Sequence, residues 1–201
     1  CGGCSTPARR DSADGSCSSC RTDAGFLAFH VAGVPVDFQV HAQRSTNAVG
    51  FWSATLATFF SIAYVVGQLA EWLGLLGSRG GPSSSSTPLG LIVLLTPSLF
   101  LGSSFLLLTV SIHCLAPVDK KIWSHAAVAF AIAYAVLTGT VYFVQLTLVM
   151  PRIARGQTEG IEPFLFIPFD SFLYAVDILG YSFMSVATLF AARVFTGNGL
   201  Y

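Results

Sequence analysis

The chain has 201 residues, of which 53% are hydrophobic and only 10% are charged, and its mean hydropathy is +0.68. Soluble domains usually carry about 25% charged residues, so the chain lacks the polar surface of an ordinary water-soluble enzyme. Ten basic residues balance ten acidic ones, which leaves no basic surface for nucleic acid. These numbers predict an integral membrane protein whose main partner is the lipid bilayer.

Residues 1–44 differ in composition from the rest of the chain, being rich in Gly, Ser and Ala. We expect them to form a disordered tail. Apolar and polar residues alternate over 34–41, as in a strand, but one isolated strand does not stabilise itself. The segment has neither an initiating Met nor a signal peptide, so we expect a chain that was processed, truncated or assigned from a wrong start.

The tail holds two Cys-x-x-Cys pairs separated by twelve residues. Two such pairs can supply four thiolates to a tetrahedral zinc ion. However, the spacer is shorter than in common zinc ribbons, and it contains no hydrophobic residue larger than Ala or Pro. We therefore favour a tail without a cofactor and keep zinc as the alternative, with a lipidated amino-terminal cysteine as a further one. The candidate zinc ligands are Cys1, Cys4, Cys17 and Cys20.

Four apolar segments follow, each long enough to cross the ~30 Å hydrocarbon core as a helix of about 20 residues. Because the segments are continuous, they favour helices over the short alternating strands of a barrel. Polar linkers rich in turn residues separate them, and we expect Pro151 to end the third helix. The predicted fold is all-α, a four-helix transmembrane bundle over residues 45–201, with spans at about 49–76, 89–115, 122–150 and 168–195.

The spans differ in how much polar surface they carry. The second has almost no polar side chains beyond small hydroxyl groups, so we expect it to be the most lipid-exposed helix. Gly102 and Gly139 are expected to let neighbouring helices approach closely. Basic residues are slightly more frequent at one end of the bundle, which places both termini in the cytoplasm of a multi-pass cell-membrane protein. The residues behind this assignment are Arg44, Lys120, Lys121 and Arg193.

Polar side chains recur at steps of three or four in three spans, which places them on one face of each helix. An unpaired charge in hydrocarbon costs about 2.5–3.5 kcal/mol, so we expect these faces to meet inside the bundle, near the outer side of the membrane. Besides Ser61 and Tyr64, which share the face of the first span, the candidate residues for binding a proton or small ligand are Gln68, Glu71, Tyr142, Gln145, Asp170, Tyr174, Asp177 and Tyr181.

A structural interpretation of the same residues competes with the functional one. Tyr, Thr and Gln side chains commonly join helices in membranes, Asp170 suits the cap of the fourth helix, and Glu71 can extend to the headgroups. Asp177 is the hardest to explain in this way. Because no basic residue of the spans lies at its depth, we expect its carboxyl group to bind a proton at neutral pH.

Several kinds of chemistry have no counterpart in the sequence. No span contains a lysine, and there is no P-loop, dinucleotide fingerprint or nucleophile elbow, so we expect a protein that is not an enzyme. His113 ends the second span and His125 opens the third, a pair that could hold a metal or haem. We favour interfacial histidines, because His113 lies nearer the end of its helix than His125 does.

The last third of the chain carries several short motifs: 144–147 (VQLT), Pro151, 155–160 (RGQTEG), 177–181 (DILGY) and 189–192 (LFAA). Over residues 142–201 the chain resembles a loose group of bacterial polytopic membrane proteins of unknown function, and the first two spans are similar to it only in pattern. The resemblance implies a multi-helix membrane fold and no particular activity. Members of the group generally continue into one or two further helices, which implies an incomplete copy here, and the cysteine tail departs from their pattern.

Together these observations predict a non-enzymatic membrane protein, structural or accessory, whose outer polar cluster binds a proton or a small polar ligand. The first alternative is a subunit or fragment of a proton- or solute-coupled transporter, which assembles as a homo-oligomer or with other membrane subunits. The second is a membrane redox protein that uses the cysteine pairs or the histidine pair.

Overall fold

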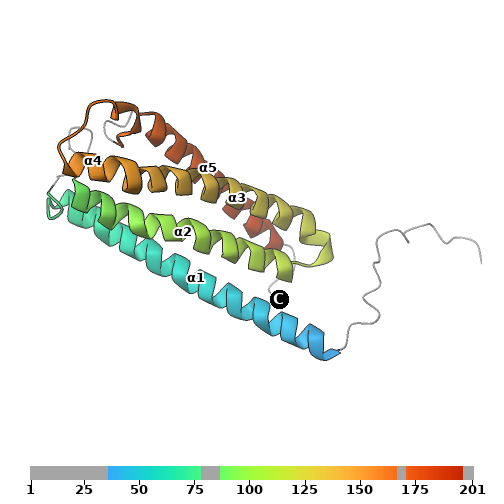
Figure 1. Cartoon of the computed structure of the whole chain (residues 1–201). Helices are drawn as coiled ribbons and strands as arrows, with labels where there is room; N and C mark the ends of the chain where they lie inside the picture. Colours follow the sequence, from blue (N-terminus) through green and yellow to red (C-terminus); the bar gives the residue numbers. More distant parts are fainter. Residues whose placement is uncertain (1–35, 78–86, 167–170, 197–201) are drawn as a thin grey trace, which may run out of the picture. The chain divides into compact units, whose positions relative to one another are not determined.

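The structure is a computed structural model that describes residues 36–77, 87–166 and 171–196, and over 36–42 it describes the backbone alone. All regular structure in these ranges is helical (Figure 1), as predicted. The elements are α1 (Val36–Trp72), α2 (Pro88–Leu115), the 3-10 turn η1 (Val118–Lys120), α3 (Lys121–Val144), the π-helical turn η2 (Gln145–Val149), α4 (Met150–Ala154), the 3-10 turn η3 (Glu162–Phe164) and α5 (Phe172–Phe195).

Helix α1 begins earlier than the sequence analysis predicted. Residues 36–44 were assigned to the tail, but the helix already includes them. Pro35 directly before the helix and Asp37 in its first turn are both signals of a helix start, and they outweigh an alternation only eight residues long. The predicted disordered tail over 1–35 lies outside the described residues.

The third apolar segment continues as a helix through Pro151 to Ala154, so the prediction that Pro151 ends it is wrong. A proline has no N–H, and its ring clashes with the carbonyl group four residues earlier. The wider π-helical turn η2 ends at Val149 and includes Thr147, the residue four positions before Pro151, which leaves room for that ring. The helix stops at Gly156, whose φ of +68° suits a helix end, and the N–H groups of Gly156 and Gln157 bond carbonyls of the last turn at 3.0 Å.

Side-chain caps start the helices that follow the two connections near one end of the bundle. Thr87 Oγ1 accepts a hydrogen bond from the Gly90 N–H at 3.1 Å and donates one to the Leu76 carbonyl at 2.6 Å. Ser171 Oγ accepts from the Tyr174 N–H at 3.2 Å, so Ser171 takes the capping position that was considered for Asp170. These caps satisfy N–H groups that a helix leaves without partners at its start.

Helix α3 is the central element of the fold, since it contacts α2 and α5 (Figure 1). Its buried side chains recur at steps of three or four, so they form one continuous face. Small residues on this face let the neighbouring helices approach closely. The buried positions of α3 are Ser124, Ala127, Ala131, Tyr134, Thr138, Val141 and Tyr142.

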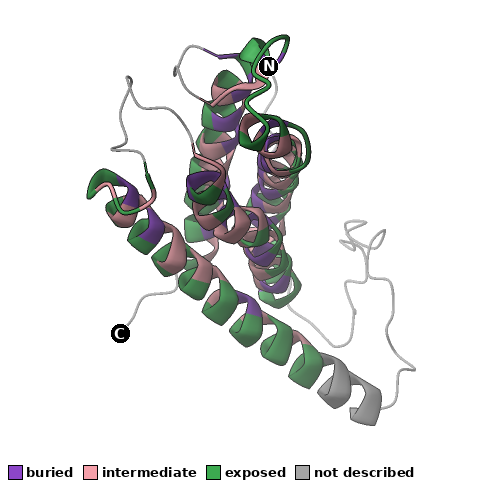
Figure 2. Ribbon diagram, turned by 60° about the vertical axis from the view of Figure 1, so that its left-hand side comes forward, coloured by how far each residue is buried: buried purple, intermediate pink, exposed green. Residues whose placement is uncertain are grey.

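Helix α2 packs on two sides, and the prediction that it is the most lipid-exposed helix is wrong. Phe60 of α1 stacks on Phe100 of α2 with ring centroids 5.5 Å apart. On the side of α3, a Cβ atom added at Gly102 would lie 3.6 Å from Thr138 Oγ1 and 3.7 Å from Ala135 Cα. Gly and small hydroxyl residues therefore mark close helix contacts here. Of the four long helices, α1 is the most exposed in its span over 43–72 (Figure 2).

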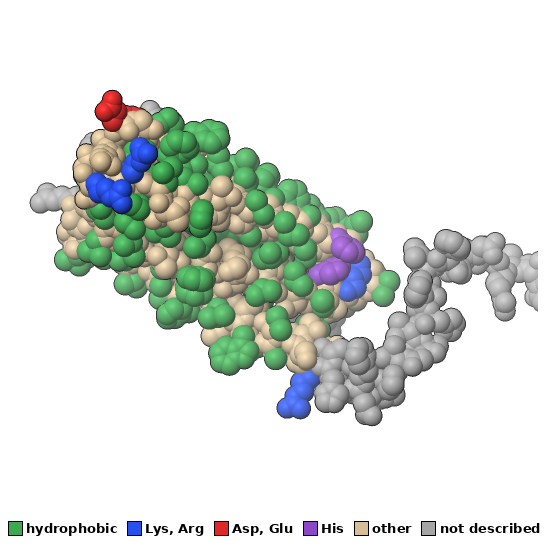
Figure 3. Space-filling view, viewed as in Figure 1, with side chains coloured by type: hydrophobic (Ala, Val, Ile, Leu, Met, Phe, Trp, Pro, Cys, Tyr) green, Lys and Arg blue, Asp and Glu red, His purple; other side chains and the backbone are tan. Residues whose placement is uncertain are grey.

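The outer faces of the long helices carry large apolar side chains. Phe51, Phe59 and Leu189 are each more than 60% exposed, and each square ångström of apolar surface costs about 25 cal/mol in water. On the face that Figure 3 shows, charged side chains gather at the two ends, with apolar and uncharged surface between them. Four helices are long and apolar enough to cross a membrane: Gln43–Trp72, Pro88–Leu115, Val118–Ala154 and Phe172–Phe195.

Candidate ligand-binding cavity

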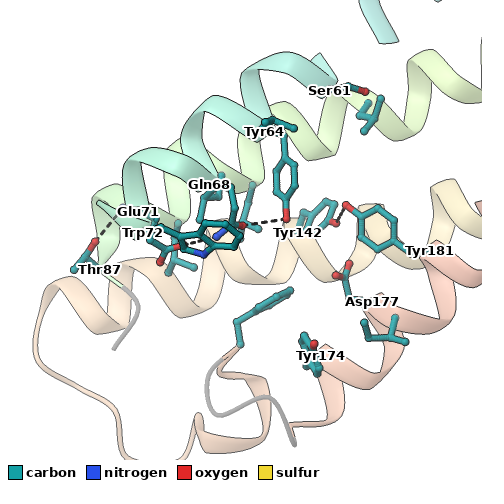
Figure 4. A pocket seen from close by; sticks show the side chains of 18 residues that line it. Ser61, Tyr64, Gln68, Glu71, Trp72, Thr87, Tyr142, Tyr174, Asp177 and Tyr181 are labelled. Atoms are coloured by element: carbon teal, nitrogen blue, oxygen red, sulfur yellow. Dashed lines mark hydrogen bonds between the residues drawn. The ribbon is translucent and has the colours of Figure 1, made fainter. Parts of the chain in front are cut away.

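A cavity of about 690 Å³ lies between α1 and α5. Residues of α1 and α5 form its walls, and the apolar side chains Leu91, Leu94 and Leu95 of α2 form its floor. Figure 4 shows Tyr64 extending from α1 toward Tyr142, while Asp177 approaches from α5. The volume falls within the range of about 300–1,000 Å³ that is usual for small-molecule sites.

The α1 wall carries a row of polar side chains connected by hydrogen bonds. The Tyr64 hydroxyl donates to Gln68 Oε1 at 3.2 Å, and Gln68 Nε2 donates to Glu71 Oε2 at 3.2 Å. These residues are three and four positions apart, so the helical repeat aligns them along one face. Glu71 is 8% exposed and lies near the end of the helix. The row thus extends from the interior of the cavity toward the end of α1.

The α5 wall contains Asp177, the more buried of the two carboxyl groups that line the cavity. The Tyr142 hydroxyl donates to the Tyr181 hydroxyl at 2.9 Å, which joins α3 to α5 next to Asp177. Asp177 is only 5% exposed, and no donor among the described residues reaches its Oδ1. A buried polar atom without a partner costs about 1–3 kcal/mol. The fold therefore leaves an acceptor of this residue unsatisfied.

The structure brings six of the eight candidate residues to this one cavity, from three helices: Gln68, Glu71, Tyr142, Tyr174, Asp177 and Tyr181. Gln145 is not among the lining residues. It is fully buried, and its Nε2 donates to the Phe164 carbonyl, so it holds η3 against the π-helical turn. The remaining candidate, Asp170, lies outside the described residues, as do the proposed zinc ligands Cys1, Cys4, Cys17 and Cys20.

Other lining residues were not among the candidates. Ser61 and Tyr64 line the cavity, and the sequence analysis had placed both on the polar face of α1 without counting them as binding residues. Trp72 lies at the end of α1, where aromatic residues are common in membrane helices. Phe166 comes from the loop before α5, and no periodic pattern could have placed it. The leucines of α2 gave no signal either, because they look like any other apolar residues of a span.

The two histidines lie in contact at the opposite end of α2 and α3. Their ring centroids are 4.2 Å apart, and His113 Nδ1 is 2.8 Å from Ser124 Oγ. His113 does lie nearer the end of its helix than His125, but the two rings nevertheless contact each other. Metal–nitrogen bonds of about 2 Å on each side of an ion would need a wider separation, so the rings as placed do not sandwich a haem iron.

Within the described ranges, no group of three or more His, Cys, Asp or Glu residues is arranged to hold a metal ion. The cavity instead combines polar walls with an apolar floor, an arrangement that suits a small organic ligand with one polar group. Comparisons with protein-family models, curated proteins and solved structures returned no match for this chain. The resemblance noted for residues 142–201 stays a prediction.

Proposed function

We propose that the chain is a non-enzymatic membrane protein that binds a small ligand in the cavity between α1 and α5, with Asp177 as the group that the ligand contacts. The protein crosses the cell membrane four times with both termini in the cytoplasm, and the cavity lies toward the outer side. The observation that supports this proposal is the buried Asp177 Oδ1, which has no donor among the described residues although a cavity of ligand size lies beside it.

The proposal is tested by the reactivity of a cysteine in the cavity wall. In a variant with all native cysteines replaced by serine, we expect Ser61→Cys to react with methyl methanethiosulfonate in lipid nanodiscs. Ser61 lines the cavity. Only the thiolate form of a cysteine reacts with this reagent, and the thiolate forms only in a polar, hydrated environment. The neutral reagent reaches lipid and water alike, so the rate reports the environment of the thiol.

Ser103→Cys is the matched control, because Ser103 is also an exposed serine near the middle of a long helix but does not line the cavity. We expect Ser61→Cys to react about tenfold faster, since hydrocarbon suppresses thiolate formation. Equal rates would show that the cavity is filled by acyl chains and would contradict the proposal.

A second candidate function is a subunit of a proton-coupled carrier, assembled as a dimer or with other membrane subunits. Its support is that two carboxyl groups, Glu71 and Asp177, line the same cavity from different helices. In proteoliposomes under an imposed potential, a trapped pH-sensitive dye should report proton flux that Asp177→Asn reduces to the level of protein-free liposomes. Proton flux that is unchanged in this variant, or absent from the wild type, would contradict the carrier function and leave ligand binding as the proposed function.

A further inference from the structure

We propose that the ligand class of the cavity is organic cations, meaning molecules with a quaternary or protonated amine and an apolar body. This inference rests on the proposed function and specifies its ligand. The lining residues that the structure describes include the carboxyl groups of Glu71 and Asp177 but no Lys, Arg or His. An anionic ligand would meet only carboxyl groups there. A cation would instead favour the ionised form of a carboxyl group that holds a proton in its absence, and would gain a partner in a site of low dielectric.

The walls of the cavity are rich in aromatic side chains. The electron-rich faces of Trp, Tyr and Phe rings attract ammonium groups, with about 0.5–2 kcal/mol for each favourable contact. Rings come from α1, α3, α5 and the loop before α5, so they surround the cavity rather than cover one side of it. The aromatic residues are Tyr64, Trp72, Tyr142, Phe166, Tyr174 and Tyr181.

The side chains that line the cavity favour organic cations over metal ions. Calcium takes six to eight oxygen ligands, and the described residues form no group of three or more acidic, His or Cys side chains that could hold a metal. The floor of Leu91, Leu94 and Leu95 instead contacts an apolar body. Asp177, which is 95% buried with an unsatisfied Oδ1, then receives the positive group or an N–H of an ammonium.

Two kinds of molecule in a membrane carry such an organic cation: a lipid with a choline headgroup and a free amphiphilic amine. The test uses the Ser61→Cys protein described above, reconstituted in nanodiscs of either phosphatidylglycerol or phosphatidylcholine. Phenyltrimethylammonium is added as the cation, and tert-butylbenzene, in which carbon replaces the nitrogen, is the neutral control of the same shape. The readout is the rate at which methyl methanethiosulfonate modifies the cysteine.

In phosphatidylglycerol we expect saturating phenyltrimethylammonium to slow modification about tenfold, and tert-butylbenzene to slow it less than about twofold, because only the cation gains the charge and ring contacts. Asp177→Asn should abolish the protection, and Glu71→Gln should weaken it. If the choline headgroup is the occupant, modification in phosphatidylcholine is already slow without additive, and Asp177→Asn restores it. If free amines are the occupant, the cation protects equally in both lipids.

Equal protection by the cation and its neutral isostere, or protection that survives Asp177→Asn, would overturn the assignment of organic cations and leave the cavity as a site for another ligand. Failure of the neutral reagent to distinguish Ser61→Cys from Ser103→Cys would instead contradict the proposed function itself. The Ser103→Cys protein also controls for accumulation of the cation at anionic lipid, because its modification rate should not change.

Discussion

Gly180→Ala is expected to destabilise the protein by about 1–3 kcal/mol, which is the usual cost of inserting a methyl group into a tightly packed site. A Cβ atom added at Gly180 would lie 2.6 Å from Thr138 Cγ2 and 3.7 Å from the Thr138 backbone nitrogen. Thr138 is β-branched, nearly fully buried and bonded to the Tyr134 carbonyl at 2.9 Å, so its methyl group has little freedom to move. The added atom must push α5 away from α3.

Gly139→Ala is the matched control, because no described atom lies within 4 Å of a Cβ added there. Alanine favours a helix over glycine by about 1 kcal/mol, so this variant should be as stable as the wild type or more stable. Both variants are compared by denaturant-induced unfolding of the detergent-solubilised protein, followed by circular dichroism. If Gly180→Ala unfolded at the same denaturant concentration as Gly139→Ala, the close approach of α3 and α5 would be wrong.

These two glycines show what the sequence analysis could and could not predict about packing. The four helices follow from the continuous apolar segments, which are confirmed within a few residues for α2 and α5. Gly102 and Gly139 were both expected at close helix contacts, which is correct for Gly102 and wrong for Gly139. Gly180, which does lie at such a contact, was not predicted. A glycine in a span indicates that a contact is allowed, but the rotation of each helix about its axis decides which glycine is used, and that rotation depends on all the neighbouring side chains.

The cavity was predictable to the extent that it depends on helical periodicity. Gln68 and Glu71 share one face of α1, and Tyr174, Asp177 and Tyr181 share one face of α5, so antiparallel packing brings the two sets to the same depth. Gln145 follows the same periodicity and is buried like Tyr142, but η3 lies against it, and its Nε2 donates to the Phe164 carbonyl. No pattern in the sequence predicted that a loop segment would contact this part of the polar face.

Asp177→Leu is expected to stabilise the protein by about 1–3 kcal/mol while it removes ligand binding. The carboxyl group is buried, and its Oδ1 has no donor among the described residues, so an apolar side chain of similar size relieves the cost of an unsatisfied polar atom. Such a gain in stability distinguishes a functional residue from a structural one, because replacing a side chain that joins helices would lower the stability of the protein.

Gln145→Leu provides the opposite case within the same set of candidate residues. Gln145 is also buried, and its Oε1 likewise lacks a donor among the described residues, but its Nε2 donates to the Phe164 carbonyl. Leucine would remove the unsatisfied oxygen but would leave that carbonyl without its donor, at a cost of about 1–3 kcal/mol that offsets the gain. The midpoint of unfolding should therefore rise for Asp177→Leu but not for Gln145→Leu. A lower midpoint for Asp177→Leu would show that the carboxyl group holds α5 in place, and the case for a binding residue at this position would fail.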